Sequence, residues 1–197
     1  MAEAIQPAQS PAGKQRWLDA WCAWAWGLGE ATFFFIVPDL LLTRFALQRG
    51  LAHALRQCLW ALAGALVGGL LVYAIARSGR AEQLAAAFTF LPGISPALIT
   101  GAGTSLAHDG WSALFSGALR GTPYKLYALH AGTQALSVKS FLLASLAARL
   151  LRFGLTTLAA WWIGRWLGRY LTTARLLQVH LLFWLLFYAA YFGIMGV

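Results

Sequence analysis

Two acidic and two basic residues, each close to a proline within apolar sequence, are the first candidates for chemistry. Glu30 and Asp39 lie nine residues apart, and Arg120 and Lys125 lie five residues apart. A carboxyl group in apolar surroundings has a raised pKa and can carry a proton. A guanidinium group binds phosphate through two parallel hydrogen bonds. The four residues therefore predict a polar site for phosphate binding and proton transfer.

Arg149 and Arg152 are secondary candidates, because residues three apart share one face of a helix. They predict a second cationic site or buried partners for an acid, and a helix that ends or kinks near Gly154 is an equal alternative. The four histidines and two cysteines have no metal-ligand spacing, so we expect no metal and no cofactor. Ser105 and His108 lack the motif of a hydrolase, so we expect no enzyme.

The composition places these charges in a membrane protein. Of the 197 residues, 60% are hydrophobic and only 11% are charged, whereas about a quarter are charged in a soluble domain. This excludes a soluble enzyme, a disordered tail and a nucleic-acid module. The net charge of +9 comes from 15 basic residues scattered between apolar segments. That distribution is typical of positive-inside loops and of proteins that attract anionic lipid headgroups.

Two kinds of apolar segment predict an all-α polytopic membrane fold. Residues 58–76 are free of charge and match the about 20 residues that cross a bilayer. Two other segments are interrupted by charge and by turn residues, which are Pro38 in the first and Gly121 and Pro123 in the second. Non-helical backbone at membrane depth survives only inside protein or beside water. We therefore predict two re-entrant hairpins whose breaks face each other, so that the acids of one pair with the bases of the other.

Interrupted segments at corresponding places in two halves favour a transporter-type inverted repeat with an added C-terminal helix. If residues 84–107 spanned the membrane instead of connecting the halves, everything downstream would be inverted. The predicted segments are a disordered tail (1–16), a membrane domain (17–170) and a last spanning helix (171–197). Within the domain they are hairpin 1 (17–50), a spanning helix (51–77), a connector (78–108), hairpin 2 (109–132) and a second spanning helix (139–166).

Counting basic residues predicts a cytoplasmic N-terminus. With this topology eight basic residues lie on the side of the N-terminus and three on the other, and the side richer in Lys and Arg is normally cytoplasmic. The larger group is Lys14, Arg16, Arg44, Arg49, Arg56, Arg165, Arg169 and Arg175, and the smaller is Arg77, Arg80 and Lys139.

The segment from Glu30 to Asp39 resembles the first motif of the DedA (VTT-domain, SNARE-associated-like) membrane proteins, YqaA-like branch. That motif has a Glu, a Pro-containing turn and a second acid nine positions on. Residues 116–125 (SGALRGTPYK), followed by Ala-Gly at 131–132, resemble the second motif, and residues 141–153 are also similar to this branch. The turn proline is displaced by one position, and the second base is a Lys one position earlier than in larger members. Together the matches cover about residues 27–166.

The resemblance implies a lipid translocase of the flippase or scramblase type, acting on a lipid phosphate such as polyprenyl phosphate or a phospholipid, often with proton coupling. It implies a bacterial cytoplasmic (inner) membrane, and Glu30, Asp39, Arg120 and Lys125 as the residues for substrate and protons. Expected partners are anionic membrane lipids and protons, with no nucleic acid, and a homo-oligomer is allowed. The alternatives are a small-solute or ion transporter and a non-transporting membrane-homeostasis protein.

Overall fold

The computed structural model describes residues 11–195, and over this range the chain is helical with no strand. The predicted all-α class is therefore confirmed for this range. The predicted tail lies outside the described residues as far as residue 10, whereas residues 11–16 belong to the first helix. The helices are α1 (Pro11–Glu30), α2 (Asp39–Arg49), α3 (Leu51–Ile75), α4 (Ala81–Phe88), α5 (Pro96–Asp109), α6 (Ser112–Arg120), α7 (Tyr124–Thr133), α8 (Val138–Leu167) and α9 (Thr173–Met195).

Three helical segments of the described range are long and apolar enough to span a membrane, which indicates an integral membrane protein. They are Leu51–Phe88, Val138–Leu167 and Thr173–Gly193. The first combines α3, a π-helical turn (Ala76–Arg80) and α4. Gly79 interrupts this segment, because its φ of +87° is not helical and the helix changes direction there. Glycine suits this position, since other residues rarely adopt a positive φ.

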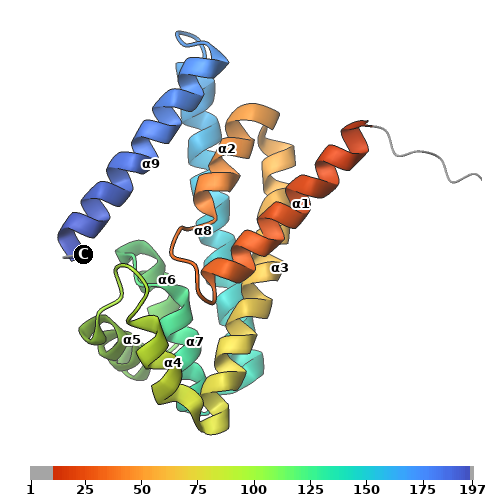
Figure 1. The fold of residues 1–197 in the computed structure, drawn as a ribbon. Helices are drawn as coiled ribbons and strands as arrows, with labels where there is room; N and C mark the ends of the chain where they lie inside the picture. Colours follow the sequence, from red (N-terminus) through yellow and green to blue (C-terminus); the bar gives the residue numbers. More distant parts are fainter. Residues whose placement is uncertain (1–10, 196–197) are drawn as a thin grey trace, which may run out of the picture.

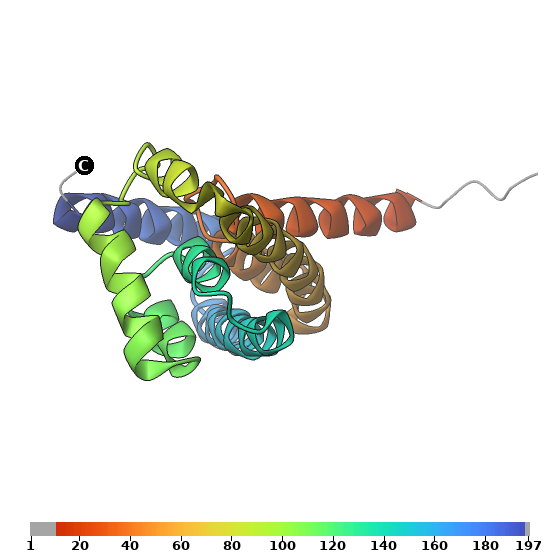
Figure 2. The same cartoon turned by 90° about the horizontal axis from the view of Figure 1, so that it is seen from below.

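Helices α3 and α8 lie side by side and run antiparallel at the centre of the fold (Figure 1). At one end the Tyr73 hydroxyl of α3 donates to the Leu136 carbonyl just before α8, at 2.6 Å. At the other end Leu47, at the end of α2, touches Gly164 of α8. Helices α4 to α7 gather at the first end, and α1 and α9 extend from the core in opposite directions (Figure 2).

Glycines allow α1 and α3 to pack with their backbones in contact. A Cβ at Gly64 of α3 would lie 2.0 Å from the Trp24 carbonyl oxygen of α1, and one at Gly27 of α1 would lie 2.0 Å from the Ala61 carbonyl oxygen. Small residues at such positions let membrane helices approach closely. The Gly64-x-x-x-Gly68 pattern therefore packs helices within this chain.

The residues of the predicted connector form the short helices α4 and α5, of 8 and 14 residues. At 1.5 Å per residue, α5 is about 21 Å long, which is less than the ~30 Å of bilayer hydrocarbon. Neither helix is among the candidate spans by itself. The interrupted segments each become two helices, with breaks at residues 31–38 and 121–123.

Candidate functional site

The first break, at residues 31–38, is held by side chains from three other helices. The Trp26 indole N–H of α1 donates to the Ile36 carbonyl at 2.9 Å, and the Val37 N–H donates to the Tyr188 hydroxyl of α9 at 2.8 Å. Because non-helical backbone lacks its helical partners, such bonds replace those that water would otherwise provide. Figure 1 shows this break beside the middle of α8.

The third side chain is Lys125, in the first turn of α7. Its ammonium donates to the Phe34 carbonyl at 2.7 Å, and only 1% of the residue is exposed. Lys125, two positions after the second break, therefore contacts the backbone of the first break. The structure brings the two breaks together, through a backbone carbonyl rather than through an ion pair with an acid.

Both acids pair with arginines of α8. Glu30, the last residue of α1, forms an ion pair with Arg149, and Asp39, the first residue of α2, forms one with Arg152. The Thr156 hydroxyl of α8 also donates to the second oxygen of Asp39, at 2.7 Å. We call Glu30, Asp39, Arg149 and Arg152 the ion-pair cluster.

The predicted pairing of the acids with Arg120 and Lys125 is wrong. Arg120 ends α6 with its side chain exposed, and it is in none of the ion pairs among residues 11–195. The left-handed turn at Gly121 (φ +82°) ends α6 directly after Arg120. Helix α2 instead packs along α8, so the acids meet the arginines that the sequence offered as secondary candidates.

The turn residues lie at the ends of the helices, as their types predict. Pro38 immediately precedes α2, where the missing N–H costs no helical hydrogen bond. Gly121 takes the left-handed conformation after α6, and Pro123 (φ −61°, ψ 132°) precedes α7. These breaks place Glu30, Asp39 and Lys125 at or near helix ends, from which the two acids reach α8 and Lys125 reaches the Phe34 carbonyl.

The ion-pair cluster is almost fully removed from the surface. The exposed fractions are 4% for Glu30, 1% for Asp39 and 3% for Arg149, and the Arg152 side chain is 19% exposed. Arg149 and Arg152 lie near the midpoint of α8, a candidate span. A buried charge is tolerated only when it is paired, and removal of one partner is strongly destabilising. The four charges therefore depend on one another.

Arg149 has hydrogen-bond donors that no atom of residues 11–195 accepts. Its Nε and Nη1 atoms are buried without a partner among the described residues. The guanidinium carbon lies 4.1 Å from the centre of the Tyr124 ring. Buried donors normally have partners, so unpaired ones mark a place for water or for an anionic group.

Sequence reasoning missed three participants, Tyr124, Thr156 and Tyr188. Thr156 carried a signal, since Arg149, Arg152 and Thr156 follow the spacing of one helical face. Tyr188 carried none, because it contacts a break 151 residues earlier in the chain.

Asp19, Arg49 and His53 form a further polar group, away from the ion-pair cluster. Arg49 pairs with Asp19, and His53 Nε2 lies 3.0 Å from the same carboxylate. This group joins α1 to the turn between α2 and α3. Among the described residues, no three His, Cys, Asp or Glu side chains gather as metal ligands would.

Comparisons of this chain with protein-family models, with curated proteins and with solved structures find no match.

Proposed function

We propose that this chain translocates lipids with an anionic phosphate headgroup across the membrane, as a flippase or scramblase, with proton control. The main supporting observation is a pair of arginines at the middle of α8, of which Arg152 is partly buried and Arg149 is buried with unpaired donors. A charged residue inside a membrane segment is costly and is normally functional. Guanidinium groups are suited to bind phosphate bidentately.

The breaks supply the route in this proposal. We take α1–α2 and α6–α7 as re-entrant hairpins, related as an inverted repeat, whose tips meet beside α8. The contact of Lys125 with the Phe34 carbonyl supports this arrangement. A lipid phosphate that reached the tips of the hairpins would bind Arg149 and Arg152. Its negative charge would then have a cationic partner inside the membrane.

Protonation of the acids provides the control. Glu30 and Asp39 occupy the arginines in the described state. A protonated carboxyl group is neutral, so it competes less well with a phosphate for a guanidinium. Each acid thus gives up its arginine when it takes a proton, and the arginine returns to the carboxylate when the proton leaves.

Reconstitution in liposomes tests the proposal. We expect wild-type protein to move fluorescent phosphatidylglycerol or a labelled polyprenyl phosphate between leaflets, at a rate that depends on the pH gradient. Arg149→Gln should lower the rate at least about tenfold, the value of one charged hydrogen bond. Arg44→Gln, an exposed charge on α2, is the control and should leave it unchanged.

Arg120→Gln distinguishes the site in the structure from the one that the sequence predicts, and we expect it to keep transport near the wild-type rate. No movement of either lipid at any pH gradient would overturn the proposal. Uptake of radiolabelled inorganic phosphate without lipid movement would favour a small-solute transporter instead.

A further inference from the structure

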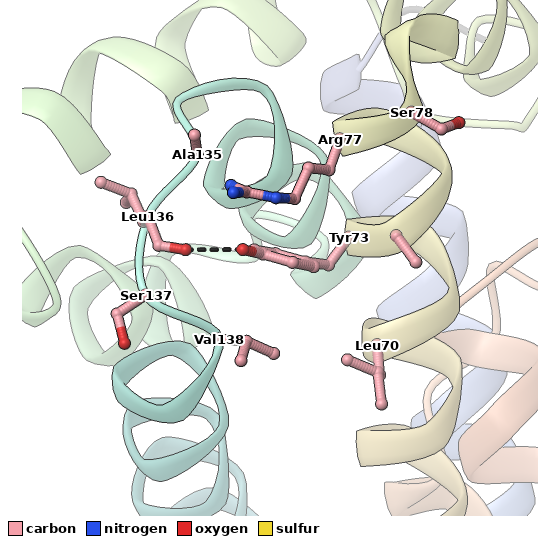
Figure 3. A pocket seen from close by; sticks show the side chains of 9 residues that line it. Leu70, Tyr73, Arg77, Ser78, Ala135, Leu136, Ser137 and Val138 are labelled. Atoms are coloured by element: carbon pink, nitrogen blue, oxygen red, sulfur yellow. Dashed lines mark hydrogen bonds between the residues drawn. The ribbon is translucent and has the colours of Figure 1, made fainter.

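A groove of about 530 Å³ lies between the end of α3 and the segment that leads into α8. Leu70, Tyr73, Ala74, Arg77 and Ser78 form one wall, and residues 135–138 form the other (Figure 3). It is distinct from the ion-pair cluster, because Val138 precedes Arg149 by 11 residues, about 16 Å along α8.

The groove is preformed. The bond from the Tyr73 hydroxyl to the Leu136 carbonyl ties the two walls together. The turn before α8 is fixed by the Ala135 N–H, which donates to the Gly132 carbonyl at 3.1 Å, and by the Leu136 N–H, which donates to the Ala131 carbonyl at 3.0 Å. Gly132 itself packs against the Tyr73 backbone. A ligand would therefore meet a rigid site.

Among the described residues that line the groove, Arg77 is the one with a charged side chain. Figure 3 shows its guanidinium extending from α3 toward Ala135, across the groove and beside the Tyr73 ring. The Ser78 hydroxyl donates to the Ile75 carbonyl instead. The amino end of α8 borders the same groove at Ser137 and Val138, and this end of a helix carries partial positive charge. Both features favour an anion.

The remaining lining is apolar and arranged in order along the helix. Leu70 and Ala74 of α3 and Arg77 of the π-helical turn that continues it follow one another on one helical face. Leu70 is 38% exposed and Val138, opposite, is 37% exposed. Both belong to candidate spans. Along the groove, apolar side chains lead to a cationic one, and a phospholipid likewise has an apolar acyl chain that leads to an anionic phosphate. The groove volume of about 530 Å³ is also far larger than a phosphate ion needs.

We infer that this groove binds one anionic phospholipid, with its phosphate on Arg77 and an acyl chain against Leu70 and Val138. The site is a fixed lipid contact at the end of the helix pair α3–α8. Lipid binding in this groove does not depend on lipid transport at the ion-pair cluster.

Native mass spectrometry of the full chain, titrated with phosphatidylglycerol, tests this inference. Wild-type protein should retain a tightly bound lipid, and Arg77→Gln should weaken that binding at least about tenfold. Arg80→Gln removes a charge at the same end of the protein that does not line the groove, and it should leave binding unchanged. Val138→Trp keeps Arg77 but fills the groove, and it should also prevent binding.

Further measurements distinguish phospholipid binding in this groove from binding elsewhere and from binding of phosphate alone. Arg44→Gln, which removes an exposed charge of α2 that does not line the groove, should leave this binding event in place. Phosphatidylcholine should bind more weakly, and inorganic phosphate should not displace phosphatidylglycerol. Equal losses in Arg77→Gln and Arg80→Gln would reduce the effect to general charge attraction and overturn the inference. Displacement by phosphate alone, or unchanged binding in Val138→Trp, would overturn the lipid assignment.

Discussion

At the scale of the residue, Glu30 and Arg149 should be energetically coupled. Each is nearly inaccessible and they form an ion pair, so loss of either leaves an unpaired buried charge that costs about 3–5 kcal/mol. The double variant Glu30→Gln/Arg149→Met lacks both charges. Its loss of unfolding free energy should therefore be about 2 kcal/mol or more below the sum of the single losses. Unfolding in mixed detergent micelles measures the unfolding free energies of the wild-type protein, the two single variants and the double variant.

The matched cycle pairs Glu30→Gln with Arg120→Gln. Because Arg120 is exposed and the acids pair elsewhere, these changes should add to within about 0.5 kcal/mol. Coupling to Arg120 that equalled coupling to Arg149 would contradict the pairing in the structure.

The candidate residues could be identified from the sequence, which also offered Arg149 and Arg152 as buried partners for an acid. The choice of these two arginines over Arg120 and Lys125 could not be made from it. An acid or a base in apolar sequence is conspicuous because burying it is costly, so Glu30, Asp39 and Lys125 were found as buried residues. Which base meets which acid depends on how helices pack. Arg149 and Arg152 lie more than 110 residues from Glu30 and Asp39 along the chain, and nothing local in the sequence chooses them over Arg120.

At the scale of the element, the contact between α1 and α3 should fail when a methyl group is added at Gly64. The new Cβ would lie 2.0 Å from the Trp24 carbonyl oxygen, and backbone atoms cannot give way without moving α1. Gly64→Ala should therefore lower the unfolding free energy by about 1–3 kcal/mol. Gly101→Ala, in α5, is the control, because a Cβ there meets nothing within 4 Å. It should be neutral or stabilise by up to about 1 kcal/mol through helix propensity. Similar losses at both glycines would argue against the close packing.

Helix α9 should stabilise the first break through a single hydroxyl group. Tyr188→Phe keeps the ring but removes the acceptor of the Val37 N–H, a loss of about 1 kcal/mol. Amide hydrogen exchange in residues 31–38 should then accelerate about fivefold. Tyr170→Phe changes a tyrosine that is 73% exposed and should leave this exchange rate unchanged. No acceleration in Tyr188→Phe would mean that α9 does not hold the break.

The helix breaks follow from local chemistry, whereas the arrangement of the helices does not. Proline cannot continue a helix and glycine tolerates a positive φ, so the ends of α1, α2, α6 and α7 fall near the predicted turns. The contact of α2 with α8 and that of α7 with α3 join one half of the chain to the other. Such contacts depend on the shapes of whole helix faces, which a pattern of apolar residues does not encode.

At the scale of the whole molecule, basic residues lie at both ends of the α3–α8 pair. Arg49 and Arg165 lie near the contact of Leu47 with Gly164, and Arg77 and Lys139 lie near the contact of Tyr73 with Leu136. Helix α8, with 30 residues, is about 45 Å long, enough to separate the two ends across a bilayer. These four residues belong to the two groups counted from the sequence, and the end of the larger group in that count is the proposed cytoplasmic side.

Single cysteines test this orientation in a chain whose native Cys22 and Cys58 have been replaced. Ser78→Cys and Tyr170→Cys are suitable positions, because both residues are exposed and lie at opposite ends of the α3–α8 pair. In intact cells an impermeant thiol reagent should label position 78, and it should label position 170 only after the membrane is permeabilised. The reverse pattern would invert the proposed orientation while keeping the spans. Labelling of both positions from outside would place both ends of α8 on one side, which a 30-residue helix that crosses the membrane cannot do.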